Sequence, residues 1–430
     1  MSEIENEIIS NSNFRIRFTE FILMFSMFTS SYVFFRNPFE FYPHYIIFIL
    51  YLPVLFVKYK IPKNISYILL ILLFTGLINI LLGNLDWFQF IKVWGGFFLS
   101  LNFYYFVFLY FKKNVLKIFN YYIKFCFFLL IIGLFQIIFF QIGFEPGYDF
   151  RIFFGLNKWS LVTYGGILGI KFSSFLTEPA QLAIVTIPVV FISLNNLIFN
   201  ESNFIKYKLL NIIMLFLYVL ITSATGFIGL LICLIVIAVR NKVYNIFLGL
   251  IPSLAILLIL YNNVSDFKIR VDAGLELNKS FEDDIQRDIA NTSTFTLYDN
   301  YIVTYNNFLE NPIIGSGIGS HQYAFDKFSL TKKYSNLNIF ANNSKDANSL
   351  FLRIVSETGL LGVFFLFFIL YKGISTMNKL NKIEYIISVS LLLIIILSLI
   401  RQGNYFLNGL PLIFILFYYN KNIPITKPSI

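Results

Sequence analysis

The sequence predicts an all-α membrane protein: a polytopic helix bundle of about twelve transmembrane helices with one large extracytoplasmic loop. Of its 430 residues, 57% are hydrophobic and only 13% are charged, whereas soluble domains carry roughly twice that share of charge. Apolar runs close to the roughly 20 residues that a helix needs to cross a bilayer recur along the whole chain. Lys and Arg gather in every second connection between these runs, as multispan proteins require for a fixed orientation.

The apolar runs divide the chain into three parts. Residues 1–261 hold the first nine spans with an outer loop at 143–177, residues 262–348 form the large periplasmic or extracellular loop, and residues 349–430 hold the last three spans. The predicted spans are 17–35, 41–57, 65–83, 88–111, 119–142, 178–199, 207–221, 224–239, 244–261, 349–371, 383–400 and 405–419.

The basic connections predict which side of the membrane each end faces. They contain Arg15 and Arg17; Lys58, Lys60 and Lys63; Lys112, Lys113 and Lys117; Lys206 and Lys208; Arg240 and Lys242; Lys372, Lys379 and Lys382; and Lys421 and Lys427. Because cytoplasmic connections carry the excess of Lys and Arg, both termini are expected in the cytoplasm. The net charge of +10 therefore reflects orientation, and no basic patch interleaved with stacking aromatics predicts a nucleic-acid partner.

A first candidate site lies at the start of the sixth predicted span. Glu178 and Pro179 open this span; proline suits the first turn of a helix, and the helix dipole favours a carboxylate there. Lys171 approaches the same point from the outer loop. Either both residues belong to a site at the outer mouth of the bundle, or Glu178 only starts a helix while Lys171 extends to the membrane interface.

A second candidate site lies in the tenth predicted span, where Arg353 and Glu357 are about one helical turn apart. Ionisable groups at this depth usually pair and face a bundle interior or a wet cavity. The pair either neutralises itself in a packing interface or lines a cavity open to the outside. We favour the cavity because other cations fall on the same predicted side, and they suit an anionic ligand such as a diphosphate. These cations are Arg151, Lys158, Lys171, Arg270, Arg287 and Arg401.

The large loop carries a third pattern. The run 296–309 predicts a helix that Asn311-Pro312 ends, and NPIIGSGIGSH follows from Asn311 to His321. Its glycines mimic part of a dinucleotide-binding fingerprint, but no βαβ unit surrounds them, so a tight turn is expected. His321 is a candidate general base near neutral pH, with a surface histidine as the alternative. No cluster has metal-ligand spacing, so no metal is expected.

Three of these stretches resemble a known family. SSFLTEPAQLA (173–183) resembles the segment of bacterial O-antigen and capsule polymerases in which a basic residue and a serine precede Phe, Glu-Pro and a small residue. NPIIGSGIG (311–319), followed by NSLFLRIVSETGLLG (348–362), resembles the end of the large periplasmic loop and the next membrane helix in the O-antigen polymerase and ligase superfamily.

The chain departs from the family pattern at three points. Lys171 stands where the family often has arginine, and the stretch 294–303 lacks an arginine that superfamily members often have. Ala347 stands where ligases usually have histidine. The loss of this histidine favours a polymerase of the Wzy type over a ligase and leaves the identity of the catalytic base open.

The resemblance implies a glycosyltransferase that polymerises undecaprenyl-diphosphate-linked oligosaccharide repeat units at the outer face of the cytoplasmic (inner) membrane. No cofactor is implied, because the diphosphate linkage already holds the energy. The implied partners are the lipid-linked oligosaccharide, membrane lipid, a chain-length regulator and a flippase. The implied catalytic candidates are Glu178, Glu357 and His321, and the implied diphosphate and sugar contacts are Arg151, Lys171, Arg270, Arg287, Arg353 and Arg401. The alternatives are an O-antigen ligase, a lipid-linked oligosaccharide transporter and a structural assembly partner.

Overall fold

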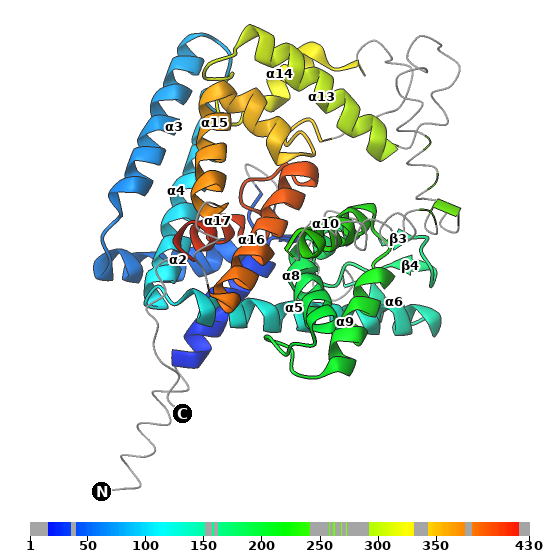
Figure 1. The fold of residues 1–430 in the computed structure, drawn as a ribbon. Helices are drawn as coiled ribbons and strands as arrows, with labels where there is room; N and C mark the ends of the chain where they lie inside the picture. Colours follow the sequence, from blue (N-terminus) through cyan, green and yellow to red (C-terminus); the bar gives the residue numbers. More distant parts are fainter. Residues whose placement is uncertain are drawn as a thin grey trace, which may run out of the picture.

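The computed structural model describes residues 16–35, 40–150, 157–158, 162–240, 292–330, 343–374 and 381–420, together with residues 258, 261, 262, 268 and 272. This part of the chain is mainly helical (Figure 1). After helical residues 16–25, the helices of the bundle are α2 (Pro43–Lys58), α3 (Lys63–Leu81), α4 (Trp87–Tyr110), α5 (Val115–Gln141), α8 (Pro179–Phe199), α9 (Lys208–Leu220), α10 (Ala224–Arg240), α15 (Leu350–Ile374), α16 (Lys382–Arg401) and α17 (Leu410–Tyr419).

Six of the described helices, α3, α4, α5, α8, α15 and α16, are long and apolar enough to cross a bilayer. Helices α2, α9, α10 and α17 are apolar but shorter. The prediction of an all-α membrane protein is therefore confirmed, whereas the count of about twelve spans stays a prediction. The predicted span 244–261 lies outside the described residues except at positions 258 and 261.

Local sequence signals explain where several helices begin. The Asp86 carboxylate accepts hydrogen bonds from the N–H groups of Phe88 (3.0 Å) and Gln89 (3.1 Å), which start α4. Asn381 and Glu384 form a reciprocal capping box at the start of α16. Such caps satisfy N–H groups that have no partner within the helix. They fix the helix ends even though the interiors are uniformly apolar.

The centre of the bundle is α8, which packs against α5, α9, α10 and α16. Within the most apolar window of α8, 78% of the residues are buried, compared with 22% in α3 and in α15. When a helix is apolar on all sides and protein covers only a small part of it, lipid must cover the rest. Helices α3 and α15 therefore form part of the lipid-facing surface, on one side of the bundle (Figure 1).

Shorter elements lie in the connections between the helices of the bundle. The predicted helix at 296–309 is confirmed as α13 (Thr292–Glu310), which packs against α14 (His321–Phe328) and α15. In the loop before α8, α6 (Glu145–Tyr148) precedes a hairpin of β3 (Thr163–Tyr164) and β4 (Ile170–Lys171), and β1 (Tyr32–Val33) pairs with β2 (Asn157–Lys158). Figure 1 shows α13 and α14 lying across the end of α15.

Helix α15 is interrupted at Gly359, whose φ of 57° and ψ of −150° are not helical. The N–H groups of Leu360 and Leu361, which lose their helical partners at the break, donate to the carbonyl oxygens of Pro312 (2.8 Å) and Ile313 (3.0 Å). The predicted turn after Asn311-Pro312 thus exists and docks into the break. Figure 1 shows α15 bending sharply at its outer end.

The same turn also meets the first part of α15. The N–H groups of Ser316 and Gly317 donate to the carbonyl oxygens of Ser356 (3.2 Å) and Glu357 (2.8 Å). These carbonyls precede the break and have lost their helical donors. This stretch, residues 311–319, is called the glycine turn. It completes the hydrogen bonding on both sides of Gly359, and it fixes the position of the part of α15 that carries Glu357.

Candidate functional site

Arg353 and Glu357 form a buried ion pair on α15, as their spacing predicts. Nε of Arg353 lies 2.9 Å from Oε1 of Glu357, and the side chains are 8% and 0% exposed. Nη1 of Arg353 donates to the Gly403 carbonyl oxygen at 3.0 Å. The Tyr405 hydroxyl donates to Oε2 of Glu357 at 2.9 Å, and the Tyr405 ring lies 4.4 Å from the guanidinium. Both carboxylate oxygens of Glu357 are thus engaged.

Arg353 also lines a cavity of about 120 Å³, which we call the charged cavity. Its lining combines the chain around the start of α2, the outer half of α4, the loop before α15, α15 itself and the loop before α17. Its charged and phenolic members include Glu40, Tyr42, Lys92, Lys345, Asp346 and Arg353. The predicted pairing of Arg353 with Glu357 is therefore observed, and Arg353 also faces a polar cavity; whether this cavity opens to the outside stays a prediction.

The loop that carries Asp346 packs closely on the loop that carries Gly403. A side chain at Gly403 would overlap the carbonyl group of Asp346, so only glycine permits this approach. Oδ1 of Asp346 accepts the N–H of Asn348 at 3.1 Å. Burial raises the pKa of Asp346 above its ordinary value, and the charge of Arg353 opposes that shift. Arg353 and Asp346 are therefore held beside Gly403 from two sides.

Glu178 and Arg401 lie near this region. Glu178 immediately precedes α8, as predicted, and its side chain is exposed. Arg401 is the last residue of α16, and both Arg401 and Asp346 act electrostatically on Glu178. The structure thus brings three of the predicted site residues, Glu178, Arg353 and Arg401, to the same end of the bundle.

Of the other predicted cations, the structure places Lys171 in a different part of the described chain. Lys171 ends β4 and borders a separate small cavity with Asp149, Gln136 and Ser173. Among the described residues, Lys171 is absent from the lining of the charged cavity. Arg151, Arg270 and Arg287 lie outside the described residues, so their contacts with substrate stay predictions.

His321 is not the surface residue considered from the sequence. It is 0% exposed at the start of α14, and it contacts Ser356 Oγ (3.1 Å) through Nδ1 and Asn300 Oδ1 (2.9 Å) through Nε2. The Asn300 amide donates to the Thr296 carbonyl oxygen (2.8 Å), so its Oδ1 is the acceptor and Nε2 carries the proton. Burial and the charge of Arg353 lower the pKa of His321 to about 3. His321 joins α13, α14 and α15 as a neutral side chain.

The buried neutral state of His321 predicts a pH effect on stability. Below pH 6.5, His321 is protonated in the unfolded chain but stays neutral in the folded chain. The free energy of unfolding therefore falls as the pH drops from 6.5 towards 3. At about pH 5 this loss amounts to roughly 2 kcal/mol. We expect His321→Gln to remove it. Urea unfolding in detergent at about pH 7 and about pH 5 measures the difference between wild type and variant. An equal acid-induced loss in both proteins would contradict the assignment.

Several residues of the charged cavity were missed in the sequence. Lys92 had a signal, because a charged residue inside an apolar span usually marks a functional site, and it sits in the predicted span 88–111. Glu40 and Asp346 lie in connections, and only the fold brings these connections together. Nothing in their local sequence separates them from other loop residues.

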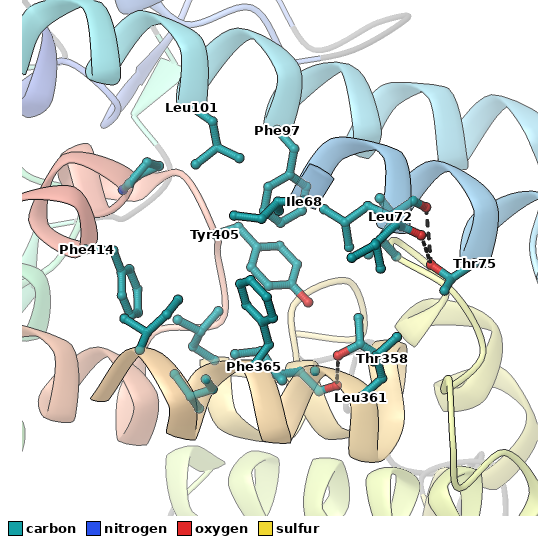
Figure 2. Close-up of a pocket in the computed structure, with 18 of the residues that line it drawn as sticks. Ile68, Leu72, Thr75, Phe97, Leu101, Thr358, Leu361, Phe365, Tyr405 and Phe414 are labelled. Carbon is teal, nitrogen blue, oxygen red and sulfur yellow. Dashed lines mark hydrogen bonds between the residues drawn. The ribbon is translucent and has the colours of Figure 1, made fainter. Parts of the chain in front are cut away.

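A second cavity adjoins the ion pair on the lipid-facing side (Figure 2). This apolar cavity, of about 230 Å³, lies between α3, α4, α15 and α17. Its lining includes Ile71, Leu72, Phe97, Leu361, Phe365 and Phe414. Ile71 is 44% exposed and Leu361 is 38% exposed, so the cavity reaches the lipid-facing surface. Figure 2 shows the Tyr405 ring between the side chains of Phe97 and Phe365. Because its hydroxyl binds Glu357, Tyr405 separates the apolar cavity from the ion pair.

The comparisons with known proteins agree with this picture at the level of a superfamily. A family model described as O-antigen ligase matches residues 209–367, which include α13, the glycine turn and the Arg353–Glu357 pair. No curated protein and no solved structure matches the chain. The match supports the O-antigen polymerase and ligase superfamily, whose members are membrane glycosyltransferase-like enzymes acting on polysaccharide. It is equally consistent with a polymerase and with a ligase.

Proposed function

We propose that the protein polymerises oligosaccharide repeat units carried on undecaprenyl diphosphate, at the outer face of the cytoplasmic membrane. The observation that carries the proposal is the position of Tyr405, which lines the apolar cavity and whose ring lies 4.4 Å from the guanidinium of Arg353 in the charged cavity. The apolar cavity reaches the lipid-facing surface, whereas the charged cavity holds Arg353. An amphiphilic anion with an isoprenoid chain and a diphosphate fits this pair of environments, and a soluble nucleotide sugar would leave the apolar cavity unused.

The chemistry of the transfer suits Arg353. The acceptor hydroxyl oxygen forms a bond with C1 of the donor sugar, the bond from C1 to the diphosphate oxygen breaks, and its electron pair leaves with the diphosphate. A fixed guanidinium stabilises the charge that grows on the leaving group. Of the five N–H donors of a guanidinium, Nε and Nη1 of Arg353 use two in the bonds to Glu357 and Gly403. No other hydrogen-bond acceptor is seen for Arg353 within the described residues, so the other donors could bind a diphosphate.

A ligase is the second candidate function, favoured by the description of the matching family model. A ligase would transfer the finished polymer to an acceptor such as lipid A–core. The polymerase is preferred because Ala347, which is fully buried in front of α15, stands where ligases usually have histidine. An alanine methyl group cannot accept a proton, so this position lacks the histidine that could act as a general base in ligases.

Purified protein and a synthetic undecaprenyl-diphosphate repeat unit test the proposal. We expect a ladder of glycan multiples on a gel, with release of free undecaprenyl diphosphate. Transfer that occurs only after lipid A–core is added would establish the ligase. Folded protein that forms neither product from the host's own repeat unit would overturn both enzymatic assignments. The Lys327→Met variant, which changes an exposed lysine on α14, provides a control that should retain the wild-type ladder.

A further inference from the structure

The carboxylates near the charged cavity differ in their freedom to take a proton. Both oxygens of Glu357 are engaged by Arg353 and Tyr405, and the side chain is 0% exposed. Oε2 of Glu40 accepts the Tyr42 hydroxyl at 2.6 Å. Glu178 does not line this cavity in the described part of the chain. Asp346 lines it and is partly exposed, with Oδ1 accepting one backbone N–H.

The position of Asp346 relative to Arg353 is fixed by backbone packing. The Asp346 carbonyl group lies against Gly403, and the Gly403 carbonyl oxygen accepts Nη1 of Arg353 at 3.0 Å. A diphosphate held by Arg353 would therefore have a carboxylate close by, on a loop that cannot shift without displacing Gly403. A general base for this reaction must lie close to the leaving diphosphate, because it must reach the acceptor hydroxyl that attacks C1 of the donor sugar.

We propose that Asp346 is the catalytic residue that accepts the proton of the attacking hydroxyl; this rests on the proposed glycosyl transfer. As the acceptor oxygen bonds to C1 and the diphosphate departs with the C1–O electron pair, the hydroxyl proton moves to the Asp346 carboxylate. The proton then passes to water, which restores the carboxylate. The proposal applies to a polymerase and to a ligase, because both activate a sugar hydroxyl.

The surroundings of Asp346 suit this role. Burial raises its pKa towards the pH of the reaction, which makes a carboxylate a better proton acceptor. Within the described residues, the charged and titratable groups around it are Arg353 on α15, Arg401 at the end of α16, Glu40 and Tyr42 before α2, His44 and Tyr45 on α2, Lys92 on α4, Lys345 in its own loop and Glu178 before α8. The charges of Arg353 and Arg401 oppose this rise in the pKa of Asp346.

The test compares Asp346→Asn with Asp346→Glu in the full-length protein. Asparagine keeps an oxygen for the Asn348 N–H, so the loop keeps its backbone contact, but it cannot accept the proton. We expect Asp346→Asn to lower kcat for glycan transfer about 100-fold or more, with little change in the KM for the lipid-linked unit. Glutamate should restore part of the rate. Asp326→Asn, which changes an exposed carboxylate on α14, should behave as the wild type.

The pH profile separates a catalytic from a structural role. Wild-type activity should fall as the pH drops through the raised pKa of Asp346, and this acid limb should shift in Asp346→Glu and vanish from the residual activity of Asp346→Asn. If the wild type transfers glycan and Asp346→Asn does so at the same rate, the role of Asp346 is overturned and the proposed function stands. Absence of transfer by the wild type would instead overturn the proposed function. Loss of rate with an unchanged acid limb would also reject Asp346 as the base.

Discussion

Replacing Arg353 with glutamine is expected to abolish polymer formation, with transfer reduced at least about 100-fold. Arg353 is 7% exposed, pairs with Glu357 and donates to the Gly403 carbonyl oxygen. Its loss removes the cation proposed to stabilise the departing diphosphate. It also leaves the Glu357 carboxylate buried without a counter-charge, which costs about 3–5 kcal/mol in folding free energy. Transfer is measured with the lipid-linked repeat unit, and stability by thermal unfolding in detergent.

A double variant distinguishes lost catalysis from lost folding. Arg353→Met with Glu357→Leu removes both charges, and apolar replacement of a buried ion pair is often neutral or stabilising. We expect the double variant to regain the wild-type unfolding temperature and to remain inactive. Recovery of both properties would show that the pair is only structural. The exposed pair of Lys327 and Glu310, with side chains 58% and 46% exposed, is the matched control: Lys327→Met with Glu310→Gln should leave transfer and stability unchanged.

The sequence predicted the fold well because membrane helices are encoded locally. The observed bounds of α3, α4, α8 and α16 lie within a few residues of the predicted spans, since each follows from one apolar run and its caps. The spacing of Arg353 and Glu357 was likewise enough to predict their pairing. These are properties of single segments, which composition and periodicity report directly.

The site was predicted less completely because it is built from contacts between distant segments. Tyr405, in the connection before α17, donates to Glu357 in α15, and Asp346 packs against Gly403 although α15 and α16 lie between them in the sequence. The burial of His321 was not predicted for a related reason. It depends on contacts with Asn300 of α13 and Ser356 of α15. A histidine in a polar glycine-rich stretch has no local feature that distinguishes a buried partner of two helices from a surface residue.

The glycine turn shows how these distant contacts are fixed, and Gly359 is the residue on which they depend. Its backbone conformation is essentially restricted to glycine. A Cβ at Gly359 would lie 2.6 Å from the Pro312 carbonyl oxygen and 2.7 Å from the Gly315 amide nitrogen. Both contacts are backbone atoms, which cannot rotate away. We therefore expect Gly359→Ala to destabilise the protein by about 3 kcal/mol or more.

Two other glycines separate the causes of this effect. Gly95 lies within α4 with open space around it, so alanine there should be neutral or slightly stabilising. Gly83 has a φ of +77° but also open space, so alanine there should cost only about 1 kcal/mol of backbone strain. The order Gly359→Ala, Gly83→Ala, Gly95→Ala, from least to most stable, is measured by thermal unfolding in detergent. If Gly359→Ala proved no less stable than Gly83→Ala, the docking of the turn into α15 would not hold the site. If the glycine turn holds α15 in this way, a Gly359→Ala protein that still folds at low temperature should also lose glycan transfer. The helical turn of α15 that carries Glu357 would then be displaced from Arg353 and Tyr405.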